Sequence, residues 1–176
     1  MARSVIDTEI GAKAEASRDD AIIGILSCTY IYSYHSLISF CSAQLYLLWS
    51  QQNSELKEKY KGINTFEELM AGQLRDIKSA LKELTSQKRI VPLHKAKPKL
   101  WQRLNELVKN YRDFFIHPNP EKFDSFVGKN GKAQWGLASE TASGILEYIY
   151  QEAYGNVPKW VNSNSLKIHR IEVVDI

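Results

Sequence analysis

The sequence predicts an all-α protein: an up-and-down bundle of four to five helices with a short irregular or β C-terminal extension. Two observations favour this fold. Apolar residues recur at intervals of three and four in several long segments, and residues that start or end helices stand between those segments. The composition agrees, because 176 residues with 44% hydrophobic and 24% charged side chains are typical of a folded domain.

The chain divides into three parts at this level. Residues 1–19 form a polar N-terminal segment without the apolar stretch of a signal peptide, so a cytoplasmic location is expected. The helical bundle is expected over residues 20–155 and the C-terminal extension over 156–176. Cys28 and Cys41 would lie roughly 20 Å apart on one helix, which is too far for a disulfide.

The first bundle element is the uncharged stretch of 29 residues from Ala21 to Trp49. It is long enough to cross a bilayer, but polar residues are scattered through it and no basic flank would fix its orientation. We therefore expect no membrane contact, and instead a long helix buried on most sides, in the centre of a bundle or across a dimer interface. His35, within this stretch, is expected to be a core histidine that could still approach an active pocket.

The next two helices are shorter. Residues 51–62, "QQNSELKEKYKG", have the pattern of a solvated helix that Gly62 would end. Thr65 and Glu68 then have the spacing of a capping box. An apolar stripe that follows this cap predicts one continuous helix to about Thr85.

The second half of the bundle begins after a loop that Pro92 and Pro98 bracket. Pro98 suits the first turn of a helix, and Pro118 should end that helix at His117 because it disfavours helical backbone there.

The remaining residues hold one more helix. Residues 118–137 are predicted to be irregular, with Asn130-Gly131 turning a short hairpin. The last helix is expected over residues 139–154, ending at Gly155. The β-branched tail beyond it could add a strand.

A basic segment precedes the motif that carries most of the functional argument. Between Leu84 and Asn105 there is no acidic residue but six Lys or Arg side chains, and Trp101 lies among them. Such a run could hold a phosphate backbone, although it could also be a solvated loop. The side chains that we expect to bind RNA are Arg89, Lys95, Lys97, Lys99, Arg103 and Lys109.

The motif itself is "RDFFIH", residues 112–117. An imidazole that can accept or donate a proton, beside a guanidinium that grips phosphate, suits RNA cleavage. Five residues turn about 140° on an α-helix, so Arg112 and His117 would share a face only if the helix ends at His117. In the alternative interpretation Arg112 pairs with Glu106 or Asp113, and His117 merely caps the helix.

These residues carry a resemblance to a known family. "RDFFIH" matches the R-x4-H motif of the HEPN superfamily (higher eukaryotes and prokaryotes nucleotide-binding domains), and "SYHSLISFCSAQLYLLWSQ" is similar to its long first helix. The resemblance implies a helical bundle that forms a homodimer, in which two facing motifs make one metal-independent RNase site. Arg112 and His117 would then be catalytic and Asp113 would orient them.

The resemblance also bears on partners. It implies RNA as substrate, no cofactor and no metal, and a role as a toxin, stress-response or phage-defence protein with an antitoxin or defence-system partner. Family toxins that are modified by a nucleotidyltransferase often have a tyrosine two residues after the histidine, where this chain has Asn119. The alternative is a non-catalytic HEPN-like module that dimerises and binds a partner protein or nucleotide.

Overall fold

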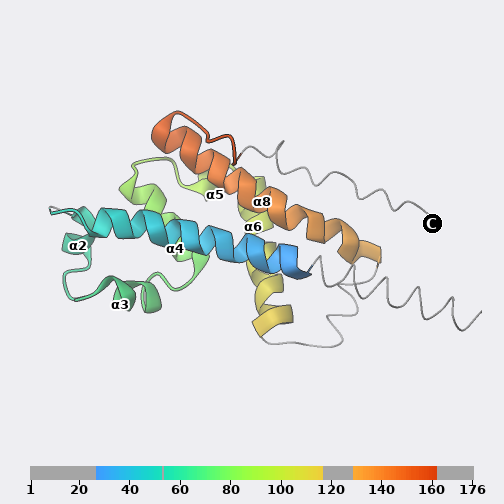
Figure 1. The fold of residues 1–176 in the computed structure, drawn as a ribbon, viewed down its shortest axis with the longest axis horizontal. Helices are drawn as coiled ribbons and strands as arrows, with labels where there is room; N and C mark the ends of the chain where they lie inside the picture. The colour runs from blue at the N-terminus through green and yellow to red at the C-terminus, as the bar shows by residue number, and fades with distance from the viewer. Residues whose placement is uncertain (1–26, 53, 117–128, 162–176) are drawn as a thin grey trace, which may run out of the picture.

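A computed structural model of the chain describes residues 27–52, 54–116 and 129–161, in which helices are present and strands are not (Figure 1). This confirms the all-α class for the described part. A long first helix spans residues 27–49. The helices that follow are α2 (Glu55–Lys59), α3 (Phe66–Ala71), α4 (Ile77–Gln87), α5 (Leu93–Ala96), α6 (Pro98–Tyr111), the π-helix η1 (Arg112–Ile116) and α8 (Lys129–Tyr154). The N-terminal segment 1–19 and the tail beyond residue 161 lie outside the described residues.

Helix 27–49 buries one face only. Its buried side chains recur at helical spacing and are 0–8% exposed: Tyr30, Ser33, Leu37, Cys41, Leu45 and Trp49. On other faces Tyr32 is 72% exposed and Leu47 is 58% exposed. The expectation of a helix buried on most sides is therefore wrong for the single chain, because one copy supplies neighbours on one side. None of the described helices is both long and apolar enough to span a bilayer.

The two cysteines on this helix lie in different surroundings. Cys28 is exposed and Cys41 is buried, and neither forms a disulfide. Burial raises the pKa of the Cys41 thiol to about 12, so it stays protonated and packs as a small apolar group.

The single helix predicted from Thr65 to about Thr85 is two helices. The capping box is present, with the Thr65 hydroxyl accepting from the Glu68 N–H and the Glu68 carboxylate accepting from the Thr65 N–H. However, α3 ends at Gly72, and the Asp76 carboxylate caps α4 by accepting from the backbone N–H groups of Lys78 and Ser79, both at 3.0 Å. The apolar stripe concealed this break because its period continues across it.

Two further expectations need correction. The region between Pro92 and Pro98 contains the short helix α5 rather than a loop, while Pro98 does open α6 as predicted. Helix α8 begins at Lys129, so Asn130-Gly131 lies within a helix and turns no hairpin. An Asn-Gly hairpin needs strands on both sides, and the residues that follow, "KAQWGLA", include the helix formers Lys, Ala, Gln and Leu.

The last helix ends where the sequence predicts. Gly155 has φ +67°, a left-handed conformation that only glycine adopts without cost, and its N–H donates to the carbonyl of Gln151 at 3.0 Å. The chain then folds back on α8, with Trp160 edge-on to Tyr150 and Val161 buried.

The two longest helices lie side by side and run in the same direction (Figure 1). The Phe40 and Tyr150 rings are 5.5 Å apart, and the Tyr154 hydroxyl donates to Gln44 Oε1 at 2.7 Å, so residue numbers rise together along both helices. An up-and-down order places the first and last of four helices antiparallel and the first and last of five parallel, so this pair does not fit a four-helix bundle of that kind. Helix α6 packs antiparallel to α8: a Cβ on Gly144 would lie 3.4 Å from the Leu100 side chain and Arg103 lies 3.9 Å from Glu140, so residue numbers rise along α6 as they fall along α8.

Candidate active site

The residues of the predicted motif lie where α6 changes its winding. Arg112 is both the C-cap of α6 and the first residue of η1, the π-helix over Arg112–Ile116. Hydrogen bonds in a π-helix join residues five apart, and single π-turns are frequent at functional sites. A π-turn holds more residues than an α-turn, so positions five apart lie closer around its axis. His117 and Asn119 lie outside the described residues.

Asp113 holds the Arg112 side chain. Both Nε and one terminal nitrogen of Arg112 are 3.1 Å from Asp113 Oδ1. The Asp113 side chain is 11% exposed and that of Arg112 is 63% exposed. The buried carboxylate therefore fixes a guanidinium whose other N–H groups face solvent, which is how an arginine is presented to an anion.

This contact is common to both interpretations of the sequence. An orienting role for Asp113 predicts it, and so does a simple surface ion pair between Arg112 and Asp113. The other partner considered for Arg112, Glu106, instead accepts a 3.4 Å hydrogen bond from Gln102. What favours a site over a surface pair is the near burial of the Asp113 carboxylate.

An aromatic cluster that the sequence did not predict joins helix 27–49 to the same end of α6. The rings of Tyr34 and Tyr111 stack with centroids 3.9 Å apart and an interplanar angle of 7°. His35 Nε2 is 2.8 Å from the Tyr111 hydroxyl. His35 is exposed, so the expectation of a core histidine is wrong. Tyr111 directly precedes Arg112, which brings an imidazole to the motif from a second helix.

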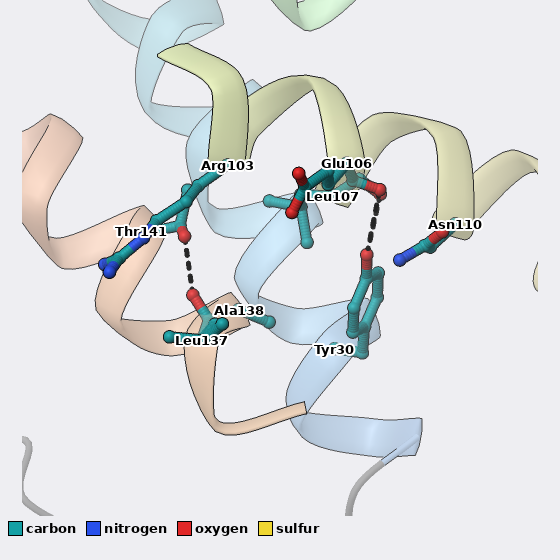
Figure 2. Close-up of a pocket in the computed structure, with 8 residues that line it drawn as sticks. All are labelled: Tyr30, Arg103, Glu106, Leu107, Asn110, Leu137, Ala138 and Thr141. Atoms are coloured by element: carbon teal, nitrogen blue, oxygen red, sulfur yellow. Dashed lines mark hydrogen bonds between the residues drawn. The ribbon is translucent and has the colours of Figure 1, made fainter. Parts of the chain in front are cut away.

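A neighbouring cleft lies between helix 27–49, α6 and α8 (Figure 2). The Tyr30 hydroxyl donates to the backbone carbonyls of Leu107 at 3.0 Å and Glu106 at 3.3 Å, and so ties helix 27–49 to α6. Burial raises the pKa of Tyr30, which keeps this donor protonated. Arg103 lines the cleft and lies 3.9 Å from Glu140 of α8.

The side chains predicted to bind RNA fall into two groups. Lys95, Lys97, Lys99 and Lys109 are exposed and have no ion pair with any described residue. Arg89, in contrast, pairs with Glu55 at 2.8 Å, and Arg103 faces Glu140. Lys82 of α4, which the sequence analysis did not single out, lies 5.8 Å from the Trp101 ring centroid.

These cations are not all near the motif. Lys99 is thirteen residues before Arg112 on the same helix, which separates the two by roughly 20 Å. Lys109 lies within one turn of Arg112 and is the only predicted RNA-binding residue described so close to it in sequence. The basic segment and the motif therefore occupy opposite ends of α6.

The approach of His35 to an active pocket was considered from the sequence, but its contact with Tyr111 was missed for a physical reason. Residues 35 and 111 are 76 positions apart, and only the packing of helix 27–49 on α6 brings them together. Nothing in the local sequence distinguishes His35 from a histidine in a core helix.

Comparison with protein-family models, curated proteins and solved structures finds no match. The resemblance in the motif therefore stands on the residues themselves. Within the described ranges no group of three or more His, Cys, Asp or Glu side chains could hold a metal ion.

Proposed function

We propose that this protein is a metal-independent endoribonuclease, with a composite site in which the R-x4-H motifs of two copies face each other. The observation that carries the proposal is the exposed Arg112 guanidinium, fixed by the nearly buried Asp113 at a π-turn. Binding an anion with a free arginine would cost the conformational entropy of fixing its side chain, and Asp113 has already fixed this one.

The reaction would be transesterification within the RNA strand. The ribose 2′-oxygen attacks the adjacent phosphorus, the bond from phosphorus to the 5′-oxygen breaks, and a 2′,3′-cyclic phosphate and a 5′-hydroxyl result. His117 of one protomer takes the proton of the 2′-hydroxyl or delivers one to the 5′-oxygen. Arg112 stabilises the charge that builds on the phosphorane. No metal is required in this scheme, because the substrate supplies the nucleophile.

Dimerisation has support from the exposed face of helix 27–49. Its exposed large side chains include Tyr32, Tyr46 and Leu47, and there is no formal charge anywhere on the helix. A second copy would cover apolar surface without burying a charge. Light scattering at micromolar concentration should give twice the mass of 20.2 kDa, and a strict monomer would remove the composite site.

Cleavage is tested most directly on total RNA with EDTA present. We expect discrete fragments that end in a 2′,3′-cyclic phosphate. Activity that appears only when magnesium is added would contradict the mechanism, since no step in it uses a metal. The same fragments should identify the RNA class and so test the proposed role as a toxin, stress-response or phage-defence protein in the cytoplasm.

A non-catalytic binding module is the second candidate, and one observation favours it. A groove beside the exposed face of helix 27–49 is lined by Ile38, Tyr46, Phe66 and Met70, and it begins about one turn after His35 on that helix. If this protein only binds a partner protein, such as an antitoxin, substitution of Met70 by Asp should abolish capture of that partner, and substitution of Arg112 should not.

A further inference from the structure

The imidazole of His35 is held on several sides although it is exposed to solvent. Its Nε2 is 2.8 Å from the Tyr111 hydroxyl. The ring also meets Tyr34 and Tyr111 edge-on, with centroids 5.7 and 5.5 Å away and interplanar angles of 88° and 85°. The ring orientation is therefore determined by two aromatic neighbours and one hydrogen bond.

The fold does not depend on this arrangement. Tyr30 already ties helix 27–49 to α6 through two backbone carbonyls, and Tyr34 stacks on Tyr111 without any contribution from the imidazole. An exposed hydrogen bond between side chains contributes on the order of 1 kcal/mol or less. Orientation is thus the main effect of the contacts on His35.

The second ring nitrogen is available to a ligand. The Tyr111 hydroxyl occupies Nε2, and no hydrogen bond joins Nδ1 to any of the residues described. With one nitrogen engaged by a tyrosine, the other can donate to a phosphate oxygen or accept from a hydroxyl.

Tyr111 links the His35 imidazole to the residue next to Arg112. Tyr111 and Arg112 are consecutive, so their Cα atoms are about 3.8 Å apart and their side chains leave the helix roughly 100° apart, on adjacent faces. The His35 imidazole contacts the hydroxyl of Tyr111. The Arg112 guanidinium, on the next residue, is fixed by Asp113. The His35 imidazole and the Arg112 guanidinium therefore both lie at the C-terminal end of α6. Each is oriented by a neighbouring side chain, and each has a nitrogen that can hydrogen-bond to a ligand.

We infer that His35 is a further substrate contact of this site, which hydrogen-bonds through Nδ1 to the ribose-phosphate of single-stranded RNA beside the group that Arg112 binds. Tyr111 is then a positioning residue for His35. The inference rests on the proposed RNase function for its substrate class. It adds a residue outside the R-x4-H motif and on a different helix.

The test compares four variants in a cleavage assay. His35→Gln should lower the cleavage rate at least about tenfold, the effect of losing one hydrogen bond to a charged group. Tyr111→Phe should lower it less, because the ring and its stack remain. Tyr150→Phe on α8 is the tyrosine control, since the Tyr150 hydroxyl has no hydrogen bond to a described residue, and Arg75→Ala is the second control, since Arg75 is exposed and has no ion pair with a described residue. Both controls should cut at the wild-type rate with unchanged melting temperatures.

A binding measurement separates this inference from the proposed function. The probe is a mixed-sequence ten-nucleotide RNA with 2′-O-methyl groups, which cannot be cleaved by attack of the 2′-oxygen. The His35 ring signals, assigned in NMR spectra by their loss in His35→Gln, should shift saturably with this probe in wild type and stay unchanged in Arg112→Ala.

The outcomes are distinct. If wild type does not cleave RNA but the His35 signals shift, the RNase function fails and the contact stands. If His35→Gln cuts RNA like wild type, or the His35 signals stay unchanged while other protein signals shift, the inference is wrong. A protein that neither cuts nor binds RNA overturns both.

Discussion

Two nearly buried carboxylates in this protein bind cations in different ways. Glu83 of α4 is 5% exposed and accepts hydrogen bonds from Lys59 at 2.6 Å, Tyr60 at 2.9 Å and Gln87 at 2.9 Å. The Asp113 side chain is 11% exposed and binds Arg112, its neighbour in sequence. The Glu83 contacts join residues 23 and 24 positions apart, so they link α2 and its C-cap to α4.

The comparison separates a contact that stabilises the fold from one that orients a side chain. A link between distant segments is lost on unfolding and so adds to stability. A pair of consecutive residues stays close in the unfolded chain, so its tertiary contribution is small and its main effect is on side-chain direction. We therefore expect Glu83 substitutions to change the melting temperature and substitutions of the Arg112–Asp113 pair to change activity.

The largest expected effect is on catalysis at the motif. Arg112→Ala and His117→Ala should each lower the RNA cleavage rate at least about 100-fold, the effect of removing a phosphate-binding cation or a general base. Melting temperatures by circular dichroism should stay within about 2 °C of wild type. Arg75→Ala is the control, since Arg75 is an exposed arginine with no ion pair to a described residue. Wild-type cleavage by both motif variants would show that the motif is not the site.

The second prediction concerns Glu83. Glu83→Gln keeps the size of the side chain but removes the charge that binds Lys59, so we expect a loss of about 2 kcal/mol in the free energy of unfolding. That corresponds to a melting temperature lower by about 4–8 °C, with cleavage unchanged. Urea denaturation should be compared with Glu67→Gln, which alters an exposed carboxylate on α3. Equal stability of the two variants would assign no stabilising role to the Glu83 contacts.

The third prediction reverses this pattern at Asp113. Asp113→Asn should lower cleavage about tenfold, because a neutral amide holds the guanidinium less firmly than a carboxylate. Its melting temperature should fall less than that of Glu83→Gln. A variant that is destabilised more than Glu83→Gln yet cleaves normally would mean that Asp113 supports the fold, and the contrast between the two acids would fail.

A smaller effect is expected at the other end of α6. Simultaneous substitution of Lys95, Lys97 and Lys99 by Ala should weaken RNA binding and reduce the slope of log K against log salt by about two units, since each phosphate contact on a single strand contributes about 0.7. Fluorescence anisotropy between 50 and 300 mM salt measures this slope. Lys61→Ala, an exposed lysine paired with Glu58 at 3.8 Å, is the control. An unchanged slope would show that these lysines contact solvent only.

The smallest predicted effect is a pH dependence of stability. Burial acts to raise the pKa of Glu83, but hydrogen bonds from Lys59, Gln87 and Tyr60 outweigh it and leave the pKa below its ordinary value of 4.5. The stabilisation is therefore fully present above pH 4.5 and is lost as the pH falls through the lowered pKa of the folded state. The stability difference between wild type and Glu83→Gln should shrink from pH 6 to pH 3 in urea denaturation. A difference that grows on acidification would contradict the lowered pKa.

Local sequence signals predicted the parts of the fold that depend on neighbouring residues. The Thr65–Glu68 capping box, the start of α6 at Pro98 and the end of α8 at Gly155 all follow from steric and hydrogen-bonding preferences within a few positions. The break between α3 and α4 was missed because a five-residue gap leaves the apolar period intact.

Contacts between distant residues could not be predicted in this way. The Glu83 network and the bond between His35 and Tyr111 depend on how helices pack, and no pattern in the neighbouring sequence marks the residues that form them. For the candidate site, the sequence predicted Arg112 and its contact with Asp113. It did not predict the π-turn or the contact between His35 and Tyr111.

The parallel packing of helix 27–49 and α8 also has a consequence for the order in which the chain folds during synthesis. Tyr154 and Gln44 are 110 positions apart, so these contacts form only after the ribosome has made nearly the whole described chain. Until then the side of the first helix that faces α8, including Phe40, has no cover from that helix. Such long-range contacts slow folding, and nascent chains with uncovered apolar surface are the ones that chaperones bind. The residues of the His35–Tyr111 and Arg112–Asp113 contacts all lie within 27–116, so the side chains of the candidate site are synthesised before α8 and before the core can be completed.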